Sequence, residues 1–490
     1  MNSTQVTALV IILLYMAATV IIGLIVSNSK KKKSETQSND DFLMAGKSLG
    51  PIVLAGTLFA ANTGGASTTG VATNVYTYGL SASWYVIASG IGFILVSFIA
   101  PYFRKTSANT VPEIISKRYG KPSHIFTAIT SIVALFMATG AQIIATASII
   151  NVVTGLDFKT AAIVSTAVVI IYTMVGGFTS VTSTNIMHVL FITLGMTIAM
   201  FVVVNNNAVG GFKVLFEKAK TINDASGNNL NLTSMTKVGF PTIVGYIAMY
   251  FMTFPTGQEI VQTYCSAKDG VSAKMGSLIA GILSAIYAIV PAIIGLVAYV
   301  CIDGFAAEGI QKNALAQSTL TFAPAWVAGI VLAAIVAATM SSASGNMIGT
   351  ATMFTNDIFV PYINKGIKDD KKEVLVSRII MVLVGLVGLI IALTASNIIS
   401  VMMGAFTLRS AGPFAAFICG IFYKNVTERA GFVSIVAGTI AAAVWIYGFN
   451  TPWGLSAMVP GGIVAFIVIF VVSAIDKKLG IPPAEPLELE

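Results

Sequence analysis

One apolar stretch of the chain is interrupted by small and polar residues at positions 60–70, although hydrophobic sequence lies on both sides. Within lipid, backbone amides and carbonyls can leave the helical pattern only where they line a cavity or bind a ligand. The stretch therefore indicates a helix that is broken around a binding site. A second polar interruption occupies residues 339–345 of a distant apolar stretch. Two such interruptions in a membrane protein are typical of a transporter.

The composition excludes an ordinary soluble protein, because 56% of the 490 residues are hydrophobic and only 10% are charged. A helix that spans a membrane needs about 20 apolar residues. On that criterion we expect an all-α protein of the inner or plasma membrane. Its thirteen expected spans begin near residues 6, 51, 81, 124, 160, 184, 239, 274, 324, 375, 400, 431 and 459. The first has no small-residue cleavage pattern, so we expect a retained helix and not a signal peptide.

The basic residues gather in alternate connecting segments. If the N-terminus lies outside, most of the 28 lysines and arginines fall on the inner side, as the positive-inside rule requires. The net charge of +8 then reflects membrane orientation, with a cytoplasmic C-terminus, and no nucleic-acid partner is expected. The longest connecting segment, residues 205–239, is polar and falls outside, where we expect a lid or spacer.

The sequence does not combine the residues that catalysis requires. A nucleophile, a base and an orienting group do not occur together, and the three cysteines are scattered, without a disulfide framework or a metal-ligand cluster. We therefore expect neither an enzyme nor a cofactor. The expected partners are the lipid bilayer, a small-molecule substrate and a coupling ion, and the expected oligomeric state is a monomer or a loose oligomer.

The interrupted spans predict an internal repeat. Spans two to six would form one five-helix unit and spans seven to eleven another, and an odd number of helices inverts the second unit relative to the first. The expected organisation is an N-terminal extra helix with a basic inner loop at 1–50, a first repeat at 51–206, an external loop at 207–238, a second repeat at 239–423, and two C-terminal helices with a tail at 424–490.

Five short segments resemble motifs of the sodium:solute symporter family. They are DFLMAGKSLG at 41–50, TVPE at 110–113, KRYG at 117–120, VGGF at 175–178 and SAK at 266–268, and their order and spacing are more specific than any one of them. The resemblance runs from about residue 6 to the end of the chain. It implies a LeuT-type 5+5 inverted repeat with discontinuous helices and sodium as the coupling ion. Carriers of this family take proline, sugars, sialic acid, pantothenate, choline or short-chain carboxylates.

The resemblance places the sodium ligands at the two interrupted stretches. It implies the carbonyls of Ala60 and Thr63 in the first stretch, and the carbonyl of Ala338 with the hydroxyls of Ser341 and Ser342 in the second. Sodium is a hard cation that binds oxygen, and the two serines follow Ala338 by about one helical turn, so that all three can face one point. The alternative is that the serines only pack and bond to their own helix.

Two asparagines depart from the family pattern. Asn62 stands where the proline carriers have an aspartate, and Asn185 stands where several members have the aspartate of a second sodium site. With Gly345 in place of a further serine, only Ser341 and Ser344 of that second site remain. We therefore predict one coupled sodium ion.

His188 leaves proton coupling open as an alternative, because an imidazole titrates near physiological pH and lies close to Asn185 in the sequence. The simpler expectation is a neutral, hydrogen-bonded histidine near the cytoplasmic end of its helix.

Arg409 is the residue that says most about the substrate. It lies about nine residues inside a predicted span, hence roughly 13 Å deep at about 1.5 Å per residue, where an unpaired charge is costly. No acidic residue falls within a span at matching depth, since Glu259 is expected to cap the inner end of its own span. A guanidinium binds a carboxylate through two hydrogen bonds, so a carboxylate-bearing substrate is one candidate partner. Backbone carbonyls of a broken helix, or a water path, are the other.

The family resemblance adds further residues around the substrate. Together with Arg409 they are Asn62, Gly64 and Ser67 of the first interrupted stretch, Gln142 of the fourth span, and Tyr250, Thr253 and Phe254 of the seventh. Glycine exposes amides near the helix break, where an anionic group can bind. The sialic acid carriers of the family have an arginine in the fourth span where this chain has residues 140–142, Gly-Ala-Gln, which argues against sialic acid.

These patterns predict a sodium-coupled symporter that imports a small carboxylate-bearing solute, an amino acid or a monocarboxylate, by alternating access. One sodium ion that crosses about 100 mV contributes about 2.3 kcal/mol, and a tenfold gradient adds about 1.4 kcal/mol. A zwitterion keeps both contributions, whereas a monoanion moves electroneutrally with one sodium and keeps only the second. A transporter-fold sensor or regulatory protein is the remaining alternative from another class.

Overall fold

The computed structural model describes residues 2–31, 48–106, 110–309, 313–395 and 397–487, with the side chains of 23–31 and 175–186 outside the description. Most of the predicted basic inner loop before residue 48 and of the first family motif therefore lies outside the described residues, as does the side chain of Asn185.

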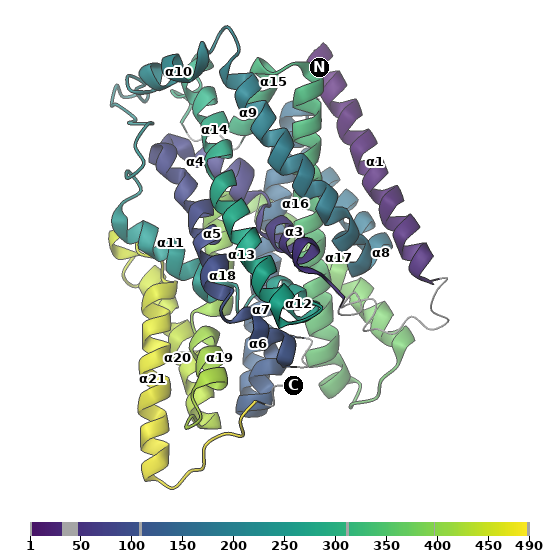
Figure 1. Cartoon of the computed structure of the whole chain (residues 1–490), viewed down its shortest axis with the longest axis vertical. Helices are drawn as coiled ribbons and strands as arrows, with labels where there is room; N and C mark the ends of the chain where they lie inside the picture. The colour runs from purple at the N-terminus through teal and green to yellow at the C-terminus, as the bar shows by residue number, and fades with distance from the viewer. Residues whose placement is uncertain (1, 32–47, 107–109, 310–312, 396, 488–490) are drawn as a thin grey trace.

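The described chain folds into a bundle in which most of the long helices run along one axis, with α1 at one edge and α21 at the other (Figure 1). The elements are α1 (Ser3–Lys31), α3 (Pro51–Asn62), η2 (Ala66–Gly70), α4 (Val71–Tyr78), η3 (Gly79–Ser83), α5 (Trp84–Val96), α6 (Ala100–Lys105), α7 (Val111–Thr154), α8 (Phe158–Leu190), η4 (Phe191–Gly195), α9 (Met196–Val204), α10 (Gly211–Ala219), α11 (Phe240–Thr253), α12 (Gln258–Cys265), α13 (Gly270–Tyr287), α14 (Ile289–Cys301), α15 (Ala314–Phe322), α16 (Ala325–Met353), η5 (Phe354–Ile363), α17 (Asp370–Thr394), α18 (Ile398–Ser410), α19 (Pro413–Phe422), α20 (Glu428–Tyr447), η6 (Pro452–Gly454) and α21 (Met458–Lys478).

The helix α16 forms the centre of the bundle. The apolar stretch that starts with α16 is 94% buried, whereas the apolar stretches of α17 and α1 are 22% and 17% buried. A helix that is apolar all round and buried belongs to the interior of a large or membrane-embedded protein. The centre of α16 carries the serines that we predicted as sodium ligands, so these side chains lie in the buried interior of the bundle.

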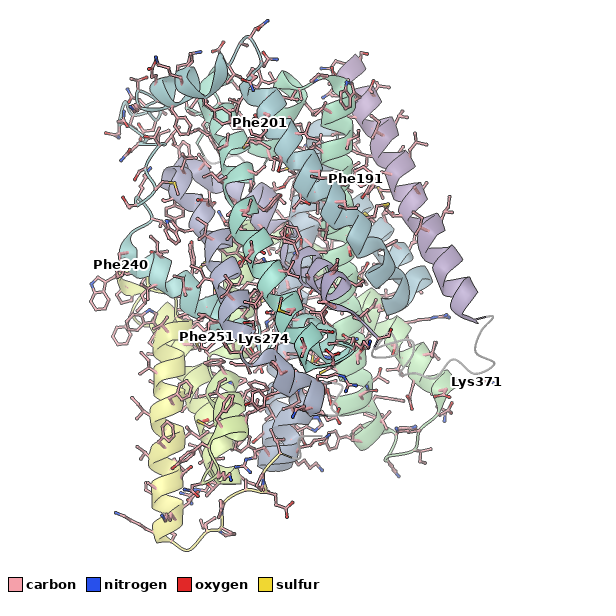
Figure 2. The ribbon with its side chains drawn as sticks, viewed as in Figure 1. Phe191, Phe201, Phe240, Phe251, Lys274 and Lys371 are labelled. Atoms are coloured by element: carbon pink, nitrogen blue, oxygen red, sulfur yellow. The ribbon has the colours of Figure 1, made fainter. Side chains whose placement is uncertain are left out.

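The perimeter of the bundle is apolar. Phe191 is 37% exposed, Phe201 50% and Phe240 76%, and Phe240 lies at the left edge of the bundle (Figure 2). The basic residues Lys274 and Lys371, which we predicted to be on the inner side, both lie in the lower part of the same view. Large exposed apolar surfaces are compatible with lipid and not with water, so the chain is a multi-pass membrane protein, as the composition predicts.

The first predicted helix break is present. Helix α3 ends at Asn62, residues 63–65 are not helical, and η2 begins at Ala66. The broken segment packs closely against α7: a Cβ on Gly65 would lie 2.2 Å from the Cβ of Ala145. Only glycine lets the broken segment pass α7 at this distance.

The second predicted break is wrong, because α16 runs without interruption through residues 339–345. Small polar residues do not by themselves break a helix, since their hydroxyls bond to carbonyls of the preceding turn. Thr339 shows this behaviour: its Oγ1 donates to the carbonyl of Val336 at 2.8 Å. The carbonyl of Ala338 therefore lies in a continuous helix and not at an unwound end.

A break that we did not predict separates α11 from α12. Helix α11 ends at Thr253 and α12 begins at Gln258. Between them lies Pro255, which lacks a backbone N–H and disfavours the helical conformation of the residue before it. The proline and the glycine at position 257 were the sequence signals that should have located this break. The discontinuity after α11 thus has a local chemical cause.

The expected count of thirteen spans is not supported. Within the described residues nine helices are long and apolar enough to cross a membrane, or ten if α18 and α19, which meet at 45°, form one span. Three further apolar helices, Pro51–Asn62, Phe158–Met174 and Phe240–Thr253, are shorter. Breaks and bends interrupt apolar stretches that the sequence shows as continuous.

The polar segment at 205–239 packs onto the turn between α4 and α5. Trp84 Nε1 donates to the carbonyl of Met235 at 3.0 Å, and the amide of Val238 donates to Ser81 Oγ at 2.9 Å. Gly79 makes the contact possible, since it has φ +59° and an added Cβ would lie 2.7 Å from the carbonyl of Leu232. The segment therefore packs against this end of the bundle; its role as a lid or spacer remains a prediction.

Candidate functional site

A small enclosed cavity lies at the break after α3. Its volume is about 20 Å³, which is room for about one water molecule, so the cavity is closed in this conformation. The residues that line it are Ala61, Asn62, Gly64, Ala66, Ser67, Tyr85, Ala138, Gln142, Tyr250, Phe254, Glu259, Ile260, Ser342, Asn346, Met402, Phe406 and Arg409. They come from both discontinuous helices and from α5, α7, α16 and α18.

Seven of the eight substrate residues predicted from the sequence line this one cavity: Asn62, Gly64, Ser67, Gln142, Tyr250, Phe254 and Arg409. The eighth, Thr253, does not line it. Its Oγ1 lies 3.5 Å from Arg409 Nε, behind the guanidinium. Sequence reasoning missed Glu259 and Asn346 as lining residues. Asn346 could have been found, because it follows Ser342 by four residues and so lies on the same face of a helix.

Side chains satisfy the backbone of the unwound segment. The amide of Gly65 donates to Gln142 Oε1 at 2.7 Å, and Ser67 Oγ donates to the carbonyl of Asn62 at 2.8 Å. Asn62 Nδ2 in turn donates to Ser89 Oγ at 2.9 Å. Polar groups freed by a broken helix persist in a membrane protein only with such partners. Gln142 therefore acts as a clamp between α7 and the break.

The candidate sodium residues gather where α3 ends against α16. Ser342 Oγ donates to the carbonyl of Ala60 at 3.4 Å, which places one predicted ligand from each helix side by side. Thr63 is fully buried, and its Oγ1 has no hydrogen-bond partner among the described residues. Ala338 and Ser341 are buried on the same stretch of α16. A buried oxygen without a hydrogen-bond partner among the described residues, such as Thr63 Oγ1, suits a hard cation such as sodium.

Ser344, one of the two serines that remain of a second sodium site, is bonded to another helix. Ser344 Oγ lies 2.7 Å from Thr173 Oγ1 of α8, within hydrogen-bond distance. Gly345 supplies no side-chain oxygen. This pairing agrees with one coupled sodium ion, which remains a prediction.

Arg409 has a protein partner, which corrects the sequence-based expectation. Its Nη1 and Nη2 each lie 2.8 Å from one carboxylate oxygen of Glu259, in a two-pronged ion pair. Glu259 does not cap the inner end of its span: it lies in the first turn of α12 and lines the cavity. The unpredicted break at Pro255 explains the error, because it places the start of α12 beside the cavity.

Contacts around the guanidinium of Arg409 link α18 to the break between α11 and α12. Arg409 lies over the ring of Phe406 at 4.9 Å, a cation–π geometry. The next residue, Ser410, places its Oγ 2.9 Å from Thr253 Oγ1 and 2.7 Å from Thr256 Oγ1. A Cβ on Gly257 would come within 2.7 Å of Arg409 Nη2, so glycine at this position admits the guanidinium.

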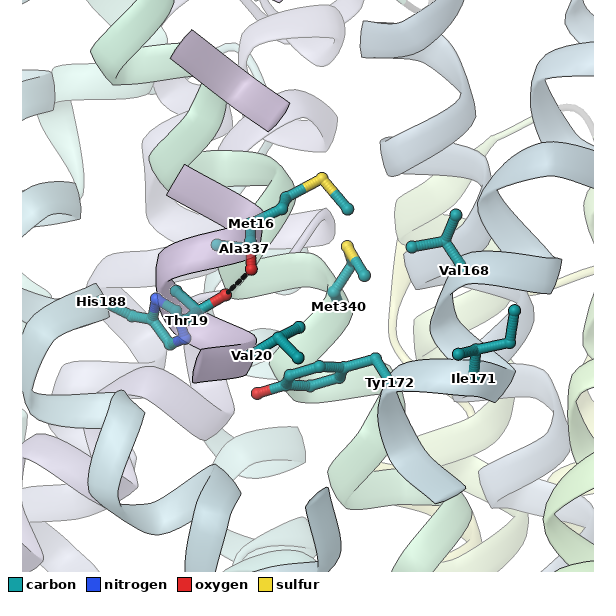
Figure 3. Close-up of a pocket in the computed structure, with 9 residues that line it drawn as sticks. All are labelled: Met16, Thr19, Val20, Val168, Ile171, Tyr172, His188, Ala337 and Met340. Carbon is teal, nitrogen blue, oxygen red and sulfur yellow. Dashed lines mark hydrogen bonds between the residues drawn. The ribbon is translucent and has the colours of Figure 1, made fainter. Parts of the chain in front are cut away.

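A second, larger cavity of about 230 Å³ lies between α1, α8 and α16, lined mostly by apolar side chains such as Met16, Val168 and Met340 (Figure 3). His188 lines this cavity and is 1% exposed. Its Nδ1 lies 3.1 Å from the hydroxyl of Tyr15, whereas its Nε2 has no partner among the described residues. The histidine is therefore hydrogen-bonded, as expected, and it binds the N-terminal helix to the bundle.

Broken and continuous membrane helices that meet around a small central cavity with polar and charged residues are typical of a secondary transporter. The chain belongs to the sodium:solute symporter family, whose model matches residues 42–438. Sodium is accordingly the coupling ion, and the protein is a transporter.

Curated relatives match over most of their length. The sodium/proline symporter of Escherichia coli (strain K12) is 27% identical over 465 residues, which cover 90% of this chain and 89% of the relative. The osmoregulated proline transporter OpuE of Bacillus subtilis (strain 168) is 24% identical, with 91% of each chain covered. The sodium/glucose cotransporter of Vibrio parahaemolyticus is 27% identical over 82% of this chain and 78% of its own.

Solved structures share the fold. A sodium-coupled sialic acid symporter in a substrate-bound, outward-open state superposes with a TM-score of 0.79 at 20% identity, and the match covers 99% of both chains. Mhp1, a nucleobase-cation-symport-1 family transporter, gives a TM-score of 0.62 at 15% identity over 90% of this chain and 96% of its own. The fold is therefore the LeuT-type fold that the motifs implied.

Proposed function

We propose that this symporter imports a small carboxylate-bearing solute, an amino acid or a monocarboxylate, together with sodium by alternating access. The observation that carries the proposal is the meeting of the two broken helices, α16 and α18 around one closed cavity that contains a guanidinium. Because the cavity holds about one water molecule, the helices must separate before a solute can enter, and such opening toward one side at a time is what alternating access requires.

Sodium binding would hold α3 against α16 in this scheme. The carbonyls of Ala60 and Thr63 with the hydroxyls of Ser341 and Ser342 offer neutral oxygens, and the carbonyl of Ala338 completes the predicted set. A cation at this place favours the conformation in which both helices are in contact. The ion and the solute would thereby stabilise the same arrangement of helices, which is the physical basis of coupling.

We further propose the inner or plasma membrane as the location, with the N-terminus outside, the C-terminus in the cytoplasm, and a monomer or loose oligomer as the working form. The repeat boundaries at 51–206 and 239–423 belong to the same proposal. Basic residues on the expected inner side support this orientation.

The proposal is tested with purified protein in proteoliposomes that are offered labelled amino acids and monocarboxylates. We expect sodium-dependent accumulation of at least one compound when sodium and the membrane potential are directed inward, and its loss when potassium replaces sodium outside. Accumulation driven by an imposed proton gradient, and indifferent to sodium, would instead support the second candidate, proton coupling through His188. The buried, unpartnered Nε2 of that histidine is the observation that keeps this candidate.

One coupled sodium ion predicts a simple dependence of uptake on sodium concentration. Because Ser344 is paired with Thr173 and Gly345 has no side-chain oxygen, we expect a hyperbolic activation curve with a Hill coefficient of about one. The measurement is the initial uptake rate at a series of external sodium concentrations and a fixed membrane potential. A sigmoidal curve, together with two charges moved per zwitterionic solute, would contradict this prediction.

A further inference from the structure

Two opposite charges line the candidate substrate cavity. Among the described residues that line it, Arg409 is the cation and Glu259 is the anion, so the cavity has no net charge. The Arg409 side chain is 2% exposed and that of Glu259 16%. Charges removed from water to this degree are costly unless each has a partner. Any solute that enters the cavity must leave both charges paired.

The short hydrogen bonds of the ion pair run between Arg409 and Glu259 themselves. Both guanidinium prongs bind Glu259. The hydrogen bond from Arg409 Nε to Thr253 Oγ1 is long, at 3.5 Å, and a further contact is with the ring of Phe406. Arg118, a second buried arginine, shows the contrasting arrangement: it donates to the carbonyls of Tyr423, Lys424 and Ala484, which are fixed backbone groups. Arg118 therefore links fixed parts of the backbone, whereas the partner of Arg409 is a side chain that a ligand can displace.

The position of Arg409 favours an anion at its guanidinium. The amino end of α12 carries partial positive charge, and Gly257 at that end lets the guanidinium approach to within close contact. Two positive groups therefore converge on the cavity, and Glu259 in the first turn of α12 now neutralises them. A substrate carboxylate can take the same place with the same two-pronged geometry.

Binding of a carboxylate that carries no cationic group would cost free energy. If it displaced Glu259 from Arg409, the Glu259 carboxylate would remain in the cavity without a cation, and an unpaired buried charge is strongly destabilising. A solute that also carries an ammonium group supplies that missing cation. A zwitterion therefore exchanges one internal ion pair for two pairs with the solute, and the cavity keeps its net charge of zero.

We propose that Glu259 and Arg409 select a zwitterionic amino acid as the substrate. The solute enters between them, so that its carboxylate pairs with Arg409 and its ammonium group pairs with Glu259. This inference rests on the proposed function and narrows its substrate class, which there included monocarboxylates. Glu259 becomes a substrate-binding residue in addition to those predicted from the sequence.

The test compares matched solutes in proteoliposomes under an inward sodium gradient. Each amino acid is paired with the carboxylate that lacks its amino group and with the amine that lacks its carboxylate, for example L-proline with cyclopentanecarboxylate and pyrrolidine, or L-alanine with propanoate and ethylamine. For the best amino acid, we expect the wild-type protein to import it at least about tenfold faster than either matched analogue, because each analogue leaves one buried charge unpaired.

Two single substitutions should each lower a different one of these two preferences. Glu259→Gln removes the partner of the ammonium group, so the preference over the matched carboxylate should fall about tenfold or more. Arg409→Gln removes the partner of the carboxylate, so the preference over the matched amine should fall instead. Glu259→Asp keeps the charge and should retain the wild-type order of the three solutes. Rates are compared per amount of folded protein, with the melting temperature as the check.

Arg429→Gln is the matched control. It removes the ion pair with Asp476 at 3.4 Å, away from the cavity, while Thr427 still donates to the buried carboxylate. Both preferences should stay unchanged.

Two results would overturn the inference alone: sodium-driven uptake of the matched carboxylate as fast as the amino acid, or variants that slow all solutes in the same proportion, as a structural ion pair predicts. Absence of sodium-driven uptake of every compound overturns the proposed function, and the inference with it.

Discussion

The double variant Ser341→Ala/Ser342→Ala is expected to abolish sodium-driven accumulation of the solute. In the wild type, one sodium ion at about 100 mV and a tenfold gradient can support accumulation of a zwitterion by a few hundredfold. Without the two hydroxyls, the carbonyls near the α3 break keep too few partners to replace the hydration shell of sodium. The inside-to-outside ratio at steady state should therefore fall to about one.

The measurement is steady-state accumulation in proteoliposomes, with and without the sodium gradient. Ser434→Ala is the matched control, because Ser434 is a buried serine of α20 whose hydroxyl bonds only to the carbonyl of Gly431 among the described residues. It should accumulate the solute like the wild type. A double variant that folds and still concentrates the solute in response to sodium would place the ion elsewhere.

Gly65→Ala is expected to reduce the initial uptake rate by at least about tenfold. Its backbone has ordinary helical angles, φ −58° and ψ −38°, so the substitution adds no strain there. The added methyl would instead lie 2.2 Å from the Cβ of Ala145, which is far inside contact distance. The broken segment must then move away from α7, and the 2.7 Å hydrogen bond from the Gly65 amide to Gln142 is lost.

The chain offers a compensating change and a control for this prediction. Ala145→Gly removes the opposing methyl, so the double variant Gly65→Ala/Ala145→Gly should recover most of the rate. Gly345→Ala adds a methyl to α16 where no atom lies within 4 Å, and its rate should stay within about twofold of the wild type. Failure of the double variant to recover would show that Gly65 acts by other means than the close approach to α7.

The sequence was most informative where local chemistry and helix geometry coincide. The small and polar residues at 60–70 predicted the first break, and Gly65, which has no side chain, lets α7 approach the broken segment closely. The family motifs implied residues from three separate spans that the structure gathers around one cavity, such as Asn62, Gln142 and Tyr250. Whether these residues bind the solute and the ion remains a prediction that the proposed experiments address.

Errors arose where the chain was treated as a row of straight spans. The run of serine and threonine near residue 340 looked like an interruption, but hydroxyls that bond to their own helix leave α16 intact. Pro255 was overlooked, so Glu259 was placed at the far end of a long helix and not at the start of a short one. The same assumption made Arg409 look like an arginine without an acidic partner.

The sequence by itself determined that this chain is an apolar, all-helical membrane protein, which family it resembles, and that its first core helix is interrupted within residues 60–70. These properties depend on residue type and on neighbours along the chain. Only the tertiary structure decided that Arg409 pairs with Glu259, that Ser342 meets the carbonyl of Ala60, and that the cavity is closed. Such contacts join residues between 150 and 282 positions apart, and they depend on how the broken helices pack, which no local pattern specifies.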